Sequence, residues 1–224
     1  MTKHYRAVVF DWDGTVMNST YTITESIRNA CADLNLPVPS VEQASWVIGL
    51  SLESALYHAV PSLTAEQVPA FIERYRAHFM QFDRNIPLFD GMRQLLDDLK
   101  EQGVLLAVAT GKSRLGLDRV LDAHGMLEYF HMTRCADEAL GKPNPRMLHD
   151  IMSELSVEER SVVMVGDTSH DVLMAHNAGV DSIAVTYGAH KLADLQEASP
   201  TVIVNDVPTL RSHLLAAIPA AVNG

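Results

Sequence analysis

The stretch AVVFDWDGT, residues 7–15, places an apolar run directly before two acids. An unbroken run of apolar residues is typical of a parallel-sheet strand that is buried on both faces. Asp11 and Asp13 follow the run, and Gly14-Thr15 then predicts a turn. Neighbouring carboxylates repel each other, so the pair is costly unless a cation neutralises it or one acid holds a proton. The stretch therefore predicts a buried strand that ends at two functional carboxylates.

Apolar runs of the same kind recur along the chain, at residues 6–10, 104–109, 161–165, 181–185 and 201–204, with a weaker candidate at 129–133. Helical patterns lie between most of these runs, at residues 92–102, 113–124, 145–155 and 170–178. Strands that alternate with helices through short loops predict an α/β fold with a doubly wound, Rossmann-like parallel sheet.

One segment interrupts this alternation. From about residue 20 to 84 the sequence contains only helical patterns, at residues 22–34, 40–48, 51–60 and 64–82. A Thr22-x-x-Glu25 capping-box signature predicts that the first of these helices begins near Thr22. We therefore expect an all-helical insert at residues 18–84, between the two parts of an α/β core at residues 1–17 and 85–224.

Composition limits the classes of function. The formal net charge of −11 argues against a nucleic-acid partner, because phosphate backbones would be repelled. No apolar run approaches the roughly 18 to 20 residues of a membrane span, and the N-terminus lacks the pattern of a signal peptide. Cys31 and Cys135 lie far apart without ligand-like spacing, which is typical of reduced, structural thiols. We expect a cytoplasmic protein without a membrane partner.

Polar residues follow three further strand candidates, in the segments VATGKS (108–113), GKPNP (141–145) and GDTSHD (166–171). They supply a hydroxyl before a helix N-terminus, a lysine before a proline-started helix, and two more acids: Thr110, Lys142, Asp167 and Asp171. Ligands of open parallel sheets bind beyond the carboxyl ends of the strands, where strand order reverses. Carboxylate oxygens suit Mg²⁺, which often holds phosphate as well. These segments therefore predict a magnesium-dependent phosphate site.

In this order, DWDGT, VATGKS, GKPNP and GDTSHD resemble the four motifs of the haloacid dehalogenase-like (HAD) hydrolase superfamily. The resemblance extends over nearly the whole chain. The insert, with WVIGLSLESAL at residues 46–56, is similar to the C1 helical cap of the phosphoglycolate phosphatase-like branch. The resemblance implies a HAD catalytic core that is covered by this cap.

The resemblance also implies a role for each motif residue. Asp11 would be the nucleophile that forms an aspartyl-phosphate, and Asp13 would be the general acid and then the general base. The phosphoryl oxygens would lie among Asp11, Gly14, Thr110, Gly111 and Lys142. Mg²⁺ would be bound by Asp11, the backbone carbonyl of Asp13, Asp167 and, directly or through water, Asp171.

Asp13 distinguishes reaction types within the superfamily. As the resemblance implies, dehalogenases lack an acid at this position, and phosphonate-cleaving relatives have a small residue there. We therefore expect a phosphatase that acts on a small phosphorylated metabolite, with phosphoglycolate first. A β-phosphoglucomutase-type phosphomutase, an inorganic pyrophosphatase and a non-catalytic HAD-fold binding or regulatory protein remain alternatives. The sequence does not determine the substrate, or whether the protein is a monomer or a homodimer.

Some residues have simpler interpretations. Thr110 could equally cap a helix, and Asp171 could be a first-turn acid that the helix dipole favours. We expect His170 to be a solvent-facing helix residue rather than a metal ligand, because hard Mg²⁺ prefers oxygen ligands. Gly111-Lys112-Ser113 resembles the tail of a P-loop, but Leu106 occupies the place of the upstream glycine, which argues against nucleoside triphosphatase chemistry.

Substrate choice would depend on the helical insert. Its candidate specificity residues are Trp46, Ile48, Gly49, Leu50, Ser51 and Arg74. The insert cations that could meet a substrate carboxylate are Arg28, Arg74, Arg76 and Arg84, although each is equally well explained as an exposed helix charge.

Overall fold

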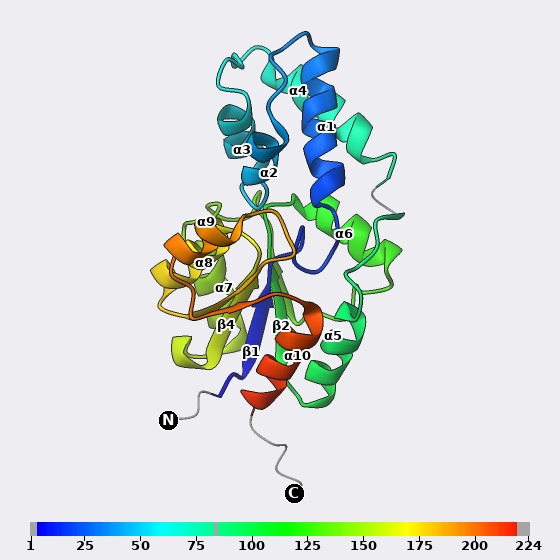
Figure 1. The fold of residues 1–224 in the computed structure, drawn as a ribbon. Helices are drawn as coiled ribbons and strands as arrows, with labels where there is room; N and C mark the ends of the chain where they lie inside the picture. The colour runs from blue at the N-terminus through cyan, green and yellow to red at the C-terminus, as the bar shows by residue number, and fades with distance from the viewer. Residues whose placement is uncertain (1–3, 83–84, 219–224) are drawn as a thin grey trace, which may run out of the picture.

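A computed structural model describes residues 4–82 and 85–218 of the chain (Figure 1). Its centre is a six-stranded parallel sheet in the order β3-β2-β1-β4-β5-β6. The strands are β1 (Ala7–Phe10), β2 (Leu105–Ala109), β3 (Met132–Arg134), β4 (Val162–Gly166), β5 (Asp181–Val185) and β6 (Val202–Val204). This order confirms the predicted doubly wound α/β class, and the direction of winding reverses between β1 and β4.

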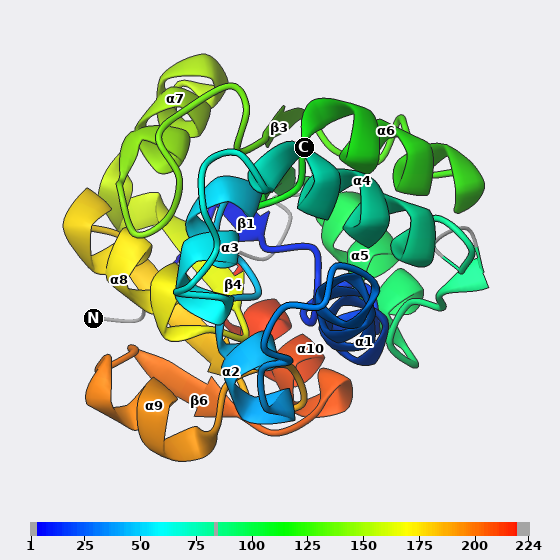
Figure 2. The same cartoon turned by 90° about the horizontal axis from the view of Figure 1, so that it is seen from above.

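Helices cover both faces of the sheet, as Figure 2 shows from above. One face carries α5 (Met92–Glu101), α6 (Arg114–Ala123) and α10 (Val207–Ala216), and the other carries α7 (Arg146–Leu155) and α8 (Ser169–Ala178). Side chains alternate along β1, so Val8 and Phe10 pack on the first face and Ala7 and Val9 on the second. Burial on both faces explains why the strand reads as an unbroken apolar run.

Three details of the core differ from the sequence prediction. The weak strand expected at 129–133 begins only at Met132, because a turn precedes it in which the N–H of Tyr129 donates to the carbonyl of Met126. A short 3-10 helix η2 (Glu159–Ser161) precedes β4. Two helices fall outside the expected patterns, α9 (Leu192–Glu197) and α10. In α9 only Leu195 is buried, so the helix has no amphipathic stripe to detect.

The described part of the insert contains four helices: α1 (Thr20–Asp33), α2 (Val41–Trp46), α3 (Leu52–Ala59) and α4 (Val68–Phe79). They lie together beyond the carboxyl end of β1, with α1 packed along α4 (Figure 1). The chain leaves and re-enters the α/β part through two adjacent segments. Asn18 N donates to the carbonyl of Pro87 at 2.9 Å, and Phe89 N donates to that of Val16 at 3.1 Å.

The predicted capping box at Thr22 and Glu25 is wrong. Helix α1 begins at Thr20 with Ser19 as its N-cap, and the Ser19 side chain makes no cap hydrogen bond. Its hydroxyl donates instead to Asp13 Oδ1 at 2.6 Å, and Glu25 pairs with Arg28 at 2.8 Å. A contact with the α/β part therefore fixes where this helix starts, which local sequence cannot reveal.

Both cysteines are buried and unpaired, as predicted. Burial raises the pKa of Cys31 to about 11 and that of Cys135 to about 12, so both thiols stay protonated near neutral pH. Within residues 4–82 and 85–218, no helix has the length and apolar character that crossing a bilayer requires.

Two helices on the same face of the sheet predict a sharp contrast between a leucine that faces the core and one that faces solvent. Leu99 of α5 is fully buried, whereas Leu115 of α6 is 77% exposed. We expect Leu99→Ala to lower the free energy of unfolding by about 2–5 kcal/mol, through lost burial and a residual cavity. Leu115→Ala should change it by less than about 0.5 kcal/mol. Urea unfolding followed by circular dichroism tests this, and equal losses would contradict the assigned packing.

Candidate active site

The motif residues meet at the carboxyl edge of the sheet, between β1 and β4. Asp11 directly follows β1, and its backbone N–H donates to the carbonyl of Val165 at 2.9 Å. The ammonium of Lys142 lies 2.6 Å from Asp11 Oδ1 and 2.6 Å from Asp171 Oδ1. Three segments that are far apart in the sequence therefore form one ion-paired cluster.

Lys142 is the cation of this cluster, and its side chain is fully buried. Burial lowers the pKa of Lys142, but the carboxylates of Asp11 and Asp171 outweigh it and leave that pKa above its usual value. The lysine therefore stays charged in the interior, where its attraction for an anion is little weakened by water.

Asp11 is almost completely buried, and for this carboxyl group the effect of burial on the pKa outweighs that of the neighbouring lysine. Burial raises its pKa well above the ordinary value; the charges of Asp171 and Asp167 add to the increase, and Lys142 opposes it. Its second oxygen, Oδ2, is buried and has no hydrogen-bond partner among the described residues. A buried carboxylate oxygen without a partner is costly, so a further positive group at this atom would stabilise the ionised form.

Asp167 follows β4 and is held through both oxygens. Thr15 Oγ1 donates to Oδ1 at 2.8 Å, and Ala189 N donates to Oδ2 at 2.7 Å. Burial, followed by the charge of Asp171, raises the pKa of Asp167 to about 7. Sequence reasoning missed the loop that contains Ala189. The signal was present, because TYGAH at residues 186–190 directly follows a strand end at the same edge of the sheet.

Asp171 contributes to both the helix and the cluster. Its Oδ2 accepts from Thr168 N at 3.1 Å and from Thr168 Oγ1 at 2.7 Å, in the capping box of α8. Its Oδ1 faces Lys142. The simple interpretation as a first-turn acid is correct but incomplete, because the two oxygens of one carboxylate point in different directions.

Asp11, Asp167 and Asp171 could hold a cation together. Each offers one oxygen, and these atoms all lie within 4.8 Å of one another. An all-oxygen, anionic set fits a hard divalent ion such as Mg²⁺, and the buried Asp11 Oδ2 has no hydrogen-bond partner among the described residues. The Asp13 side chain is directed elsewhere: its Oδ1 accepts from Ser19 Oγ at 2.6 Å and pairs with Lys112 Nζ at 3.1 Å.

Thr110 and Gly111 form the loop that follows β2. Thr110 is buried, and its hydroxyl accepts a hydrogen bond from Lys112 N at 3.2 Å. Ser113, not Thr110, is the N-cap of α6, which rules out the capping interpretation for Thr110. A Cβ on Gly111 would lie 2.4 Å from the carbonyl oxygen of Leu50, so only glycine lets the insert come this close.

Comparison with known proteins identifies this arrangement. The model of the family described as haloacid dehalogenase-like hydrolase matches residues 8–185. The chain belongs to this family. The "Probable phosphatase IndB" of Dickeya dadantii is 37% identical to it over 206 residues, which cover 88% of each chain.

Other relatives lie in the phosphoglycolate phosphatase-like branch of the HAD family. The phosphoglycolate phosphatase of Mannheimia succiniciproducens is 29% identical, over 94% of this chain and 98% of the relative. A solved structure, described as a predicted phosphatase from Clostridium acetobutylicum, is 27% identical with a TM-score of 0.84, over 95% of this chain and 99% of that one. The HAD fold therefore extends over nearly the whole molecule.

In this HAD hydrolase the expectation that His170 faces solvent is wrong. His170 is only 5% exposed, and its Nε2 donates to the backbone carbonyl of Trp46 at 3.1 Å. His190 Nε2 donates to the same carbonyl at 2.9 Å, while its Nδ1 accepts from Ser169 N at 3.0 Å. Burial is the main cause that lowers the pKa of His170, to about 4. The expectation failed because the helical insert covers this end of α8.

The segment 46–51 of the insert packs against loops of the α/β part. A Cβ on Gly49 would lie 3.3 Å from Thr168 Oγ1, and a Cβ on Gly141 would lie 3.5 Å from Ser51 Cβ. The insert arginines expected to meet a substrate carboxylate are paired within the insert, exposed, or outside the described residues. Arg28 pairs with Glu25 within α1, Arg74 is half exposed beside Glu73, and Arg76 is exposed; Arg84 lies outside the described residues.

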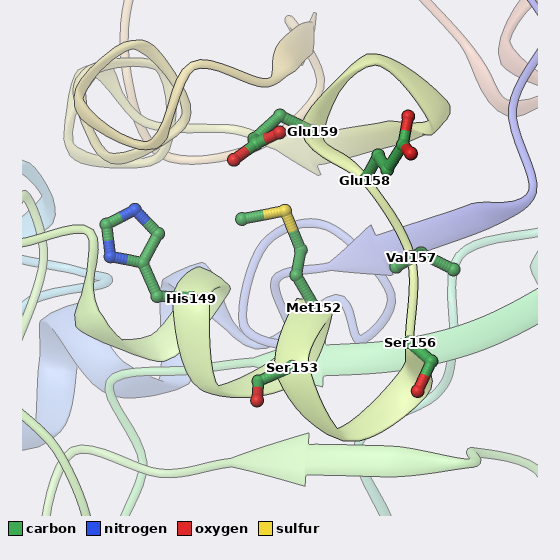
Figure 3. Close-up of a pocket in the computed structure, with 7 residues that line it drawn as sticks. All are labelled: His149, Met152, Ser153, Ser156, Val157, Glu158 and Glu159. Carbon is green, nitrogen blue, oxygen red and sulfur yellow. The ribbon is translucent and has the colours of Figure 1, made fainter.

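Figure 3 shows a surface hollow of about 460 Å³ in another region. It is lined by the end of α7 and the segment before β4: His149, Met152, Ser153, Ser156, Val157, Glu158 and Glu159. Because these residues precede β4, the hollow lies at the opposite end of that strand from Asp167. It is separate from the ion-paired cluster.

A substitution at Gly14 tests whether the first motif must lie close to Asp167. The φ of Gly14 is +83°, and a Cβ there would lie 2.2 Å from Asp167 Oδ2. We expect Gly14→Ala to lower kcat/KM for p-nitrophenyl phosphate by about 100-fold, because it displaces that carboxylate.

Gly103→Ala is the matched control. Gly103 has a φ of +73° and no atom within 4 Å of its Cβ position. It should suffer a similar backbone strain of about 1–2 kcal/mol without loss of activity. Equal activities of the two variants would contradict the close contact with Asp167.

Proposed function

We propose that this chain is a Mg²⁺-dependent phosphatase that hydrolyses a small phosphomonoester through an aspartyl-phosphate on Asp11. One observation carries the proposal. Asp11 is a buried carboxylate with a lysine ammonium 2.6 Å from one oxygen, and no hydrogen-bond partner for the other among the described residues. Cations that flank a carboxylate keep it ionised, and an ionised carboxylate is a nucleophile.

In the first step, Asp11 would attack phosphorus and the ester oxygen would leave. Lys142 neutralises negative charge on Asp11 and, in this mechanism, on the phosphoryl oxygens that come next to it. Because Lys142 is already fixed between two carboxylates, it needs no reorganisation during the reaction.

Asp13 would serve as general acid and then as general base. Its carboxylate lies two residues beyond the nucleophile and is oriented by Ser19 and Lys112. It would give a proton to the leaving alkoxide, and afterwards take one from the water that hydrolyses the aspartyl-phosphate. Ser19 would thus position the acid, which accounts for its diversion from capping α1.

Asp11, Asp167, Asp171 and the backbone carbonyl of Asp13 would hold Mg²⁺. The ion supplies charge that balances the carboxylates and the phosphoryl group. Thr110, Gly111 and Gly14 would surround the phosphoryl oxygens. The hydroxyl of Thr110 and the backbone N–H groups of its loop are the available donors for this purpose.

We further propose that residues 18–84 act as a cap over a core formed by residues 1–17 and 85–224. The contacts of segment 46–51 with the loops at Gly111, Gly141 and Thr168 support this division. Closure of such a cap would exclude water and complete the site. Phosphoglycolate is the first candidate substrate, because a 29%-identical relative is named a phosphoglycolate phosphatase. A cytoplasmic location also stays a prediction, supported by two buried, unpaired cysteines.

Binding of Mg²⁺ should depend on pH through Asp167. Its pKa is raised to about 7, and it must lose its proton to coordinate the ion. We expect the affinity for Mg²⁺ to rise with pH through about 7 and to fall by roughly tenfold or more per pH unit below it, because Asp11, whose pKa is also raised, must lose its proton as well. Isothermal titration calorimetry in two buffers of different ionisation enthalpy measures both the affinity and the released protons. A constant affinity from pH 5.5 to 8, without proton release, would contradict the proposed site.

Replacing the nucleophile tests the whole mechanism. Asp11→Asn should reduce phosphate release by roughly 1,000-fold or more, because the amide cannot form the acyl phosphate. Activity on 2-phosphoglycolate, β-glucose-1-phosphate and pyrophosphate is measured with Mg²⁺ and with EDTA, beside the exposed control Asp122→Asn.

The wild-type protein and the Asp122→Asn control should both release phosphate only with the metal. Conversion of β-glucose-1-phosphate to its isomer without phosphate release would identify a mutase instead. No turnover of any compound would overturn the enzymatic proposal in favour of a binding protein.

A further inference from the structure

A second, largely buried lysine lies beside Asp13, the other acid of the first motif. Lys112 belongs to the loop that follows β2, and its side chain is only 10% exposed. Its ammonium lies 3.1 Å from Asp13 Oδ1, whereas Lys142 contacts Asp11 and Asp171. Each of the first two acids, Asp11 and Asp13, therefore has its own lysine.

The helical insert covers Lys112 from the opposite direction. The ammonium lies 4.6 Å from the ring centroid of Phe79, near the end of α4. The rings of Phe79 and Tyr75 stack with their centroids 6.0 Å apart. Burial, followed by the charge of Asp13, raises the pKa of Tyr75, which agrees with a position close to that acid. Lys112 is thus enclosed between a carboxylate of the α/β part and an aromatic wall of the insert.

The geometry places Lys112 where the leaving alcohol must be. A general acid has to come within about 2.6–3.2 Å of the oxygen that it protonates. Lys112 Nζ is 3.1 Å from an oxygen of this acid, so a group one or two bonds from the ester oxygen falls within reach of the ammonium. Lys142 is occupied at the phosphoryl end, because it bridges the nucleophile and Asp171.

Other cations are less well placed for this contact. Arg28 donates to Glu25 and to the carbonyl of Pro39, and Arg74 is half exposed beside Glu73. These contacts lie within the insert. Lys112 is largely buried, so an anion that reaches it would meet a charge that water screens less than it would at the surface.

We propose that Lys112 binds a carboxylate on the carbon that carries the ester oxygen. It would thereby select phosphate esters of short 2-hydroxy acids over neutral phosphomonoesters. This inference rests on the proposed phosphatase function, and it assigns the recognition of the leaving group to a residue of the α/β part rather than to an arginine of the insert.

The test compares two esters that differ only in charge, 2-phosphoglycolate and 2-phosphoglycolamide. The wild-type enzyme should prefer the carboxylate by roughly 10- to 100-fold in kcat/KM, the range expected for a hydrogen bond between charged groups. Lys112→Met should abolish most of this preference by losing activity on 2-phosphoglycolate. Because Lys112 also contacts Asp13 Oδ1, the variant's kcat/KM for the amide should fall as well, but by much less than its kcat/KM for 2-phosphoglycolate.

Two further variants complete the design. Lys112→Arg keeps the positive charge and should retain most of the preference. Lys100→Met is the matched control, because Lys100 lies on α5 with its ammonium 4.3 Å from the ring centroid of Tyr129. It should behave as wild type with both esters. Thermal unfolding of each variant shows whether it is folded, and Lys112→Gln replaces Lys112→Met if the latter is not.

Every outcome is informative. An equal loss of activity on both esters in Lys112→Met would overturn the inference, because Lys112 would then act on Asp13 or on the phosphoryl group. An unchanged preference in this variant, or a wild-type enzyme that does not distinguish the two esters, would overturn it while leaving the phosphatase function intact. Failure of the wild-type enzyme to hydrolyse either ester, or p-nitrophenyl phosphate, would overturn the proposed function itself, and the inference with it.

Discussion

The arrangement of the site depends on the buried ion pairs of Lys142 with Asp11 and Asp171. A charge in the interior is costly unless it is paired and hydrogen-bonded, so three segments of the chain must meet for any of these charges to be tolerated. Burial raises the pKa of Asp11 and of Asp167, and the cluster's excess of acid over base adds to this increase. This unbalanced negative charge makes the site suitable for a cation and, next to it, for a phosphoryl group.

The sheet explains why these charges can meet. All six strands are parallel, so β1, β2 and β4 end at the same edge, and the winding reverses between β1 and β4. Residues that directly follow these strands are brought together by the sheet itself, without long flexible loops. Glycine allows the closest approaches. At Gly14 and Gly111 a Cβ would overlap Asp167 Oδ2 or the Leu50 carbonyl, so the packing of the site and the seating of the insert both require a missing side chain.

The helical insert contacts buried side chains of the α/β part. Trp46 presents one backbone carbonyl to two buried histidines, and Phe79 lies over Lys112. Side chains of the α/β part thus reach their observed positions only against groups of the insert. A change in the position of the insert would alter the surroundings of both His170 and Lys112, which links the geometry near Asp13 to the seating of the insert.

The sequence by itself determined the parallel sheet, most helices and the residues that gather at its edge. Unbroken apolar runs indicate the buried strands, and polar residues directly after these runs indicate the strand ends, so both signals are local. Only the tertiary structure decided the rest. Ser19, the N-cap of α1, donates a hydrogen bond to Asp13 instead of capping the helix. His170 is buried against the carbonyl of Trp46. The loop beside Asp167 is held by a hydrogen bond from the N–H of Ala189. The partners of Lys112 were equally hidden, since Asp13 and Phe79 come from other parts of the chain. No periodic pattern in the sequence links the residues that make these contacts. Only the folded structure shows that they meet.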